Sequence, residues 1–321
     1  MGDLYRRLKA AREATNSQER PREGSPPTSS PGSPATSAES PSNSSASEQA
    51  EGKGESQERL PPEGFELKAG VFLRREQISV EELQGGQSLP GPESPVSTPL
   101  RLLAGSAEGE RVMESHLFFD LEATGLSTGA GNVAFLLGLG RRSRESFELT
   151  QWLLPDYPWE PELLRSVAEE LERLEEELGP LTLVSYNGRS FDTPLLRTRM
   201  LMNGIPFEPP RELDLLPLTR RLWRRSLENC SLGTVEDGVL GVIRELDVPG
   251  AFVPLRYFDY LQSGRPEPLL EVVAHHRQDI LSLYLLLSRI ESILAGRDSS
   301  GTGRDSGGTA GAVDTFELAK L

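Results

Sequence analysis

The chain has 321 residues, a formal net charge of −15 and an apolar fraction of 36%, below the roughly 45–50% typical of globular proteins. Part of it is therefore expected to stay outside any packed core. The negative charge excludes a protein that coats duplex nucleic acid through a positive surface. It does not exclude an enzyme whose carboxylates bind divalent cations. The single cysteine, Cys230, excludes an internal disulfide framework and a cysteine-cluster zinc site.

The N-terminal part is predicted to lack a compact fold. Residues 1–15 are expected to form a short helix, because Leu4, Leu8 and Ala11 recur at helical spacing, and this helix is a candidate docking element for a protein partner. Residues 16–60 are rich in Ser, Pro and Gly and are predicted to be a disordered linker. With no long apolar run and no apolar signal segment, we expect a cytoplasmic protein with no membrane partner.

Residues 61–110 are predicted to form an accessory hairpin and loop segment, because apolar residues alternate on both sides of a turn signal at residues 68–70. The main domain is expected at residues 111–295, with a flexible tail at 296–321. Its expected elements are strands at 117–122, 132–140 and 147–154, a helix at 160–178, a strand at 181–186, and helices at 193–202, 213–225 and 268–294. This order predicts an α/β fold with a mixed β-sheet flanked by helices.

Two acids lie at the end of the apolar strand expected at residues 117–122. Asp120 and Glu122 are two residues apart, and residues i and i+2 of a strand point to the same face. The two carboxylates are therefore expected to emerge together, where they must be solvated, paired or bound to a cation. Alternatively, the strand ends at Phe119 and both acids are exposed in a loop.

A third acid, Asp192, follows a turn that ends the strand at residues 181–186. Pro194 suits the first turn of the next helix, which gives Asp192 the N-cap position. Capping alone accounts for an aspartate here. The same position also holds a carboxylate near the positive end of the helix dipole.

His275 and Asp279 are four residues apart in the last helix and share one of its faces. On their own they are also typical of a surface His–Asp pair. Together with the other three acids they predict a centre that binds two Mg²⁺ or Mn²⁺ ions for phosphodiester hydrolysis. A histidine can accept the proton of the attacking water near neutral pH.

Three motifs resemble those of a known family. FFDLEATGL is similar to the first, YNGRSFDTPLL to the second and HHRQDILSL to the third motif of the DEDD 3′–5′ exonuclease superfamily, in particular its YprB-like ribonuclease-H-like family. The resemblance covers roughly residues 64–294. It implies a ribonuclease-H-like fold and metal-dependent hydrolysis of single-stranded RNA or DNA from a 3′ end.

The resemblance also implies a role for each motif residue. Asp120, Glu122 and Asp279 would hold the metal ion that binds the nucleophilic water, Asp120 would bridge to the second ion, and Asp192 would bind through water. His275 would be the general base. Residues implied to border the terminal nucleotide or to shape the second motif are Ala123, Thr124, Gly125, Leu126, Asn187 and Phe191.

The spacing of the histidine departs from the family pattern. Members with a histidine base place it five residues before the last aspartate, and those with a tyrosine base place it four before. His275 is four before Asp279, and His276, three before, is the other candidate. The direction of His276 on the helix differs from that of Asp279 by about 60°, so we favour His275.

Other interpretations stay open at this stage. The same fold suits an endonuclease, or a non-catalytic binding module whose acids are structural. The segment RRLWRR at residues 220–225 suits either phosphate contacts with base stacking on Trp223 or a solvated helix face. Arg189 and Arg277, closer to the motifs, either steady a phosphate or balance the acids.

Overall fold

The structure is a computed structural model that describes residues 59–84, 89–103, 112–125, 129–244, 248–296 and 314. All of them belong to one compact unit that begins at Arg59. The segment predicted as an N-terminal helix, nearly all of the predicted linker and most of the predicted tail lie outside the described residues. In the described ranges, no helix combines the length and apolar character needed to cross a bilayer.

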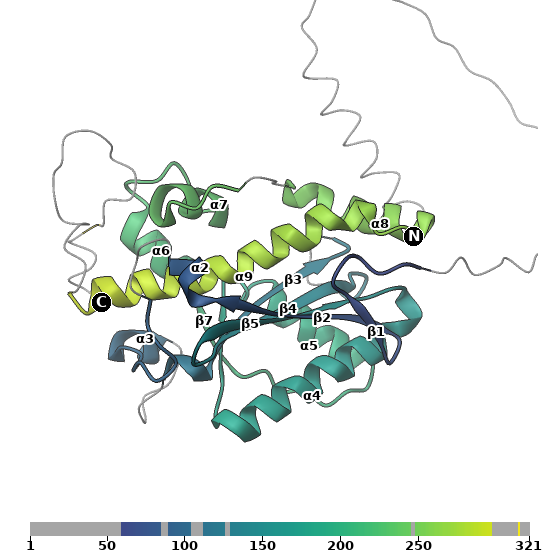
Figure 1. Ribbon diagram of the computed structural model, residues 1–321, viewed down its shortest axis with the longest axis horizontal. Coiled ribbons are helices and arrows are strands. Elements are labelled where there is room, and N and C mark those ends of the chain that lie inside the picture. The colour runs from purple at the N-terminus through teal and green to yellow at the C-terminus, as the bar shows by residue number, and fades with distance from the viewer. Residues whose placement is uncertain are drawn as a thin grey trace, which may run out of the picture. The chain divides into compact units, whose positions relative to one another are not determined.

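A seven-stranded mixed sheet forms the centre of this unit (Figure 1). Its strand order is β1-β2-β5-β4-β3-β6-β7, antiparallel from β1 to β3 and parallel from β3 to β7. The strands are β1 (Glu66–Lys68), β2 (Val71–Ser79), β3 (His116–Ala123), β4 (Ala134–Arg142), β5 (Ser146–Leu153), β6 (Thr182–Ser185) and β7 (Arg211–Asp214).

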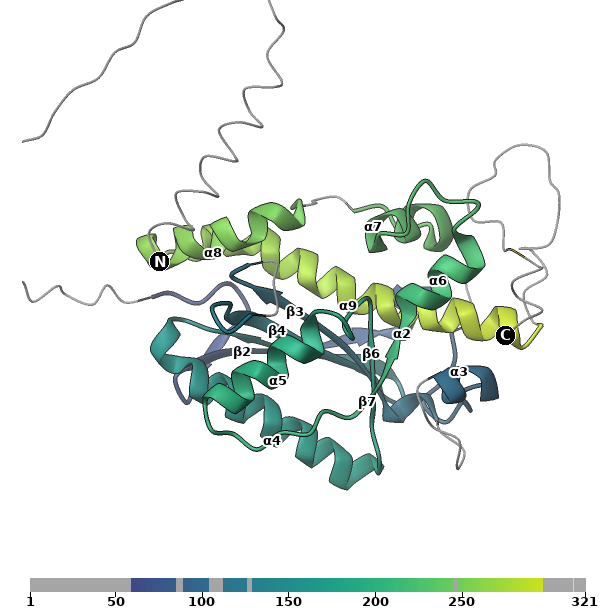
Figure 2. The same ribbon diagram turned by 180° about the vertical axis from the view of Figure 1, so that it is seen from behind.

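Helices cover both faces of the sheet. Helices α4 and α5 lie on one face, while the long helix α9 crosses the other face with α6, α7 and α8 on the same side (Figures 1 and 2). The α-helices are α2 (Val80–Gln84), α3 (Thr98–Leu103), α4 (Glu160–Leu178), α5 (Asp192–Met202), α6 (Leu215–Trp223), α7 (Leu232–Val235), α8 (Val253–Ser263) and α9 (Glu267–Leu294). The predicted class, a mixed sheet flanked by helices, is confirmed.

Two segments differ from the sequence-based expectation. Residues 213–225 were expected as one helix, but Leu213 and Asp214 end strand β7, and α6 starts at Leu215. The Asp214 carboxylate caps α6 by accepting the Leu216 N–H at 3.0 Å. The hairpin at β1 and β2 forms as predicted. However, β2 pairs with β5 from Phe72 to Ser79, so the hairpin is part of the central sheet rather than an accessory flap.

The alternating side chains of β3 divide the core between the two faces of the sheet. Leu117 and Phe119 pack in a cluster with residues of α4 and α5. Phe118 packs in a second cluster, where its ring centroid is 5.4 Å from that of Tyr284 on α9. Because alternate residues of a strand share a face, Asp120 and Glu122 lie on the side of Phe118, which α9 covers.

Gly138 of β4 allows α9 to lie close to the sheet. A Cβ atom on Gly138 would be 2.5 Å from Cε1 of His276 and would also overlap the Ile280 side chain. We expect Gly138→Ala to lower the free energy of unfolding by about 1–3 kcal/mol, because overpacking forces side chains or backbone to move. Urea denaturation measures this. Gly131→Ala is the control, since a Cβ there would meet nothing within 4 Å, and equal stability of the two variants would contradict the explanation.

Candidate active site

Strand β3 holds the first two acids. The strand runs on through Ala123, with Asp120 opposite Gly138 and Glu122 opposite Leu136 of β4. The interpretation that both acids are exposed in a loop after Phe119 is therefore wrong. Both side chains are held by a paired strand on the face that α9 covers.

Helix α9 supplies the histidine and the last acid. Nε2 of His275 lies 3.2 Å from Oδ2 of Asp279, one turn further along the helix. One ligand atom each of Glu122, His275 and Asp279 lie within 4.8 Å of one another. The first and third motifs, far apart in the chain, therefore meet in space.

Helix α5 supplies the remaining acid, although not as predicted. Phe191 is the N-cap residue, and Asp192 is the first residue of the helix, so its assignment as the N-cap is wrong. The preceding turn needs Asn187 in the left-handed region, at φ 66°, a conformation that asparagine tolerates better than most residues. The Asn187 N–H donates to Oδ1 of Asp214 at 2.7 Å, which fixes the turn.

The electrostatics show that the four acids share one environment. Burial raises the pKa of Asp120 well above its usual value, and the nearby charges of Asp279, Asp192 and Glu122 raise it further. Burial, Asp279 and Asp192 also raise the pKa of Glu122. Burying several carboxylates together is costly without a cation, and oxygen ligands suit Mg²⁺ or Mn²⁺. The donor set therefore fits a divalent metal centre.

Asp192 makes a testable contribution to stability in the metal-free protein. Burial and the charges of Glu212, Asp214 and Asp279 raise its pKa from 3.8 to about 7. Between these two pH values the folded protein binds more protons than the unfolded chain, so the free energy of unfolding falls as pH rises. Asp120 and Glu122 act in the same direction. We expect Asp192→Asn to flatten this pH dependence.

Urea denaturation in EDTA at several pH values between 4 and 8 tests this expectation. Glu172→Gln, on the exposed surface of α4, is the matched control because it removes one carboxylate outside the cluster. An unchanged pH dependence in Asp192→Asn would show that Asp192 does not share the buried cluster.

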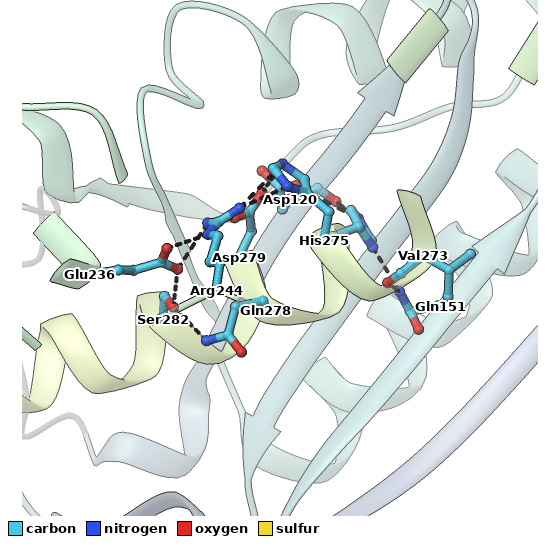
Figure 3. A network of polar contacts seen from close by, with 10 residues as sticks. Asp120, Gln151, Glu236, Arg244, Val273, His275, Gln278, Asp279 and Ser282 are labelled. Carbon is cyan, nitrogen blue, oxygen red and sulfur yellow. Dashed lines mark hydrogen bonds and ion pairs between the residues drawn. The ribbon is translucent and has the colours of Figure 1, made fainter. Parts of the chain in front are cut away.

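A cation that sequence reasoning missed lies among these acids. The guanidinium of Arg244 donates to Oδ1 of Asp279, and its Nη1 is 2.8 Å from Nδ1 of His275 (Figure 3). The same guanidinium binds Glu236 in a bidentate pair, with Nη2 at 2.9 Å from Oε1. Arg244 lies in an irregular segment after the π-helical turn Glu236–Leu240, where no sequence motif marks it.

Glu236 anchors this arginine from the interior. Its side chain is only 1% exposed, and it also accepts a hydrogen bond from the Ser282 hydroxyl of α9. Nε2 of Gln278 in turn donates to the Ser282 oxygen at 3.0 Å. The charge of Arg244 opposes part of the pKa rise of Asp120 and Glu122. The arginine is thus a fixed counter-charge at the edge of the acid cluster.

The two neighbouring histidines have different environments. His276 is fully buried, with Nδ1 at 2.9 Å from Nε2 of Gln151 and Nε2 at 3.1 Å from the Asp120 main-chain oxygen. Burial lowers its pKa to about 3, so it stays neutral and both ring nitrogens are engaged in the core. His275 is the histidine beside the Asp279 carboxylate.

The residues implied to contact substrate are distributed around the acids. Thr124 is buried, and its hydroxyl oxygen accepts the Val133 N–H at 3.0 Å, so it holds the end of β3. Gly125 lies against Asn132, where a Cβ would overlap the amide oxygen. Phe191 is 45% exposed and directly precedes Asp192. Ala123 is the last residue of β3, and Leu126 lies outside the described residues.

The structure overturns base stacking on Trp223 and leaves phosphate contacts by the same segment as a prediction. Trp223 is only 1% exposed, so it has no surface on which a base can stack. Arg277 pairs with Glu76 of β2 at 2.6 Å, which makes it a link between α9 and the sheet. Arg189 donates to the main-chain oxygen of Glu212 at 2.5 Å and supports the turn of the second motif.

A protein-family model described as the RNase_H superfamily matches residues 117–291, which include all three motifs. The chain belongs to the RNase_H superfamily. The ribonuclease-H-like fold expected from the motifs is thereby confirmed. The matched residues run from the start of β3 to the last turns of α9, so they include the strand and the helices that carry the four acids.

Two further proteins are similar to part of this RNase_H-superfamily chain. It is 39% identical over 172 residues to the uncharacterized protein YprB of Bacillus subtilis (strain 168), a match that covers 53% of this chain and 40% of YprB. A family B DNA polymerase from the hyperthermophilic archaeon Pyrobaculum calidifontis overlaps at 16% identity with a TM-score of 0.44. This overlap covers 56% of the present chain and 25% of the polymerase.

Proposed function

We propose that this protein is a divalent-metal-dependent nuclease that removes nucleotides from the 3′ end of single-stranded RNA or DNA. RNase_H-superfamily proteins are generally hydrolytic nucleases that use divalent metals, and this chain belongs among them. The observation that carries the proposal is that ligand atoms of Glu122 on β3 and of His275 and Asp279 on α9 lie within 4.8 Å of one another. Asp192 of α5 is near enough for its charge to act on Asp120. The 3′–5′ direction rests on the resemblance of the three motifs.

The proposed metal ligands are Asp120, Glu122 and Asp279 for one ion, with Asp120 bridging to a second ion near Asp192. Two bound Mg²⁺ or Mn²⁺ ions would supply an activated water and stabilise the attacking and leaving oxygens. The cost of burying these carboxylates together favours such ions. All four acids are present at positions where strand and helix geometry fix their side chains.

His275 is the proposed general base. Its ring is oriented by Asp279 at 3.2 Å from Nε2 and by Arg244 at 2.8 Å from Nδ1, contacts that limit its rotation. His276 is unsuited to this role, because its ring is fully buried in the core and cannot reach an attacking water. His275, beside Asp279 at the acid cluster, is the remaining histidine of α9.

Phe191 and Asn187 are proposed to contact the terminal nucleotide. An aromatic ring that is 45% exposed beside an acid of the centre offers a face on which a base can stack, an interaction of about 1–3 kcal/mol. This contact tolerates any base, which agrees with a nuclease that acts without sequence preference.

Oligonucleotides with a 5′ label test the proposal directly. Linear single strands of RNA and DNA should shorten stepwise with Mn²⁺ or Mg²⁺ and stay intact in EDTA. A circular single strand should stay intact with metal, since it has no 3′ end. Opening of the circle would instead identify an endonuclease, and no metal-dependent cleavage of any substrate would overturn the proposal.

A further inference from the structure

A cleft of about 890 Å³ opens beside the second motif. Its lining includes Tyr186 and Asn187 from the turn after β6, Arg220 from α6, Arg224 at the C-cap of that helix, and residues 228–232 before and at the start of α7. The Tyr186 hydroxyl donates to the Cys230 main-chain oxygen at 2.7 Å and so ties two walls together. The volume lies within the roughly 300–1,000 Å³ of known ligand sites.

The cleft carries an unusual concentration of positive charge for this chain. Arg220 in the last turn of α6 and Arg224, its C-cap in helical conformation, are four residues apart and so point to the same side, and both are exposed. Neither side chain forms an ion pair with any residue in the described ranges, whereas Arg225 beside them pairs with Asp314 at 3.1 Å. Of the lining residues, Glu228 alone is acidic. The chain as a whole has a net charge of −15, yet these two arginines have no acidic partner among the described residues. The pair is therefore suited to binding an anion from outside the protein.

The cleft adjoins the acid cluster. The N–H groups of Asn187 and Leu216, both lining residues, donate to Oδ1 of Asp214 at 2.7 and 3.0 Å. Asp214 is in turn near enough to Asp192 for its charge to act on that acid. The turn that forms one wall of the cleft is therefore also the turn that leads into α5 and positions Asp192.

We propose that this cleft binds the single-stranded nucleic acid upstream of the scissile bond, with Arg220 and Arg224 holding backbone phosphates. The inference rests on the proposed nuclease function and adds to it a second contact region on the substrate. Guanidinium groups suit phosphates because they donate paired hydrogen bonds. Contacts of this kind hold any sequence.

Fluorescence anisotropy with a labelled 12-nucleotide single strand tests the inference. The full chain is used with Asp120→Asn and EDTA, so that binding is measured without hydrolysis. Each phosphate contact on a single strand contributes about 0.7 to the slope of log K against log [salt]. We expect Arg220→Ala/Arg224→Ala to lower this slope by about 1.4 and to weaken binding roughly 20-fold at 0.1 M salt.

Arg165→Ala/Arg173→Ala is the matched control, because it removes the same charge from exposed positions of α4 on the other face of the sheet. It should leave the salt slope unchanged. Arg220→Glu/Arg224→Glu should weaken binding further than the alanine pair. Unchanged affinity and salt slope in both cleft variants would overturn the inference. Hydrolysis by the wild-type chain is assayed separately, and its absence would overturn the proposed function without altering the binding result.

Discussion

Asp120→Asn should abolish the metal-dependent hydrolysis proposed for this protein. The substitution keeps the shape of the side chain but removes the charge of the acid proposed to bridge both ions. A bound cation contributes several kcal/mol of charge stabilisation, and 1.36 kcal/mol is a tenfold change in rate. We therefore expect a loss of at least about 1,000-fold in kcat, together with loss of Mn²⁺ binding in calorimetric titration.

The same substitution should make the metal-free protein more stable. Burial and three neighbouring carboxylates raise the pKa of Asp120, so its ionised form opposes folding above the usual aspartate range. An asparagine does not carry this charge. In EDTA at pH 8, Asp120→Asn should raise the urea midpoint above that of the wild type.

Opposite changes in activity and stability are hard to produce by misfolding, which makes the pair of measurements informative. Asp237→Asn is the control, since Asp237 is exposed and both properties should stay at wild-type values. Activity that survives Asp120→Asn would refute the assignment of the site. A lowered urea midpoint would refute the account of the buried acid cluster.

Arg244→Ala should destabilise the protein by about 3–5 kcal/mol, the cost of leaving a buried charge without its partner. Glu236, with a side chain only 1% exposed, would keep only the hydrogen bond from Ser282. Adding Glu236→Gln should restore much of this loss, because the remaining group is neutral. Urea denaturation of the wild type, both single variants and the double variant gives the coupling energy.

The double variant also tests the relation between Arg244 and the metal centre. Arg244 donates to Asp279, and its charge opposes that of any cation bound there. We expect Glu236→Gln/Arg244→Ala to bind Mn²⁺ more tightly than the wild type in calorimetric titration. Weaker binding would show that the arginine supports the metal ligands instead of competing for them. Additive stability effects would show that Glu236 and Arg244 do not act as a pair.

The sequence predicts the parts of the site that follow local rules. Asp120 and Glu122 share a face because strands alternate, and His275 and Asp279 meet because helix positions four apart are neighbours. The spacing of buried residues along α9 also distinguishes the two histidines. His276 is spaced seven residues from Leu269 and from Leu283, all three of them buried, whereas His275 is one residue out of this pattern.

Other parts depend on contacts between distant segments. The pair of Glu236 and Arg244 is visible only once α9 brings Asp279 and Ser282 beside both residues. Strand β7 has four residues and continues directly into α6, so its one apolar residue, Leu213, fits a helix equally well. The pairing of β2 with β5 joins segments that no local signal connects.

The close approach of α9 to β4 has a consequence for ion selectivity. Asp120 lies directly opposite Gly138 in the ladder, and the His276 ring fills the space that a side chain at Gly138 would take. The main chain of β4 at Gly138 and the packed side chains of α9 thus set the distance between β3, which carries Asp120, and α9, which carries Asp279. Since Mg²⁺ and Ca²⁺ differ in preferred ligand distance by about 0.4 Å, a bulkier residue at position 138 would widen the proposed metal site toward larger ions without altering any of its proposed ligands.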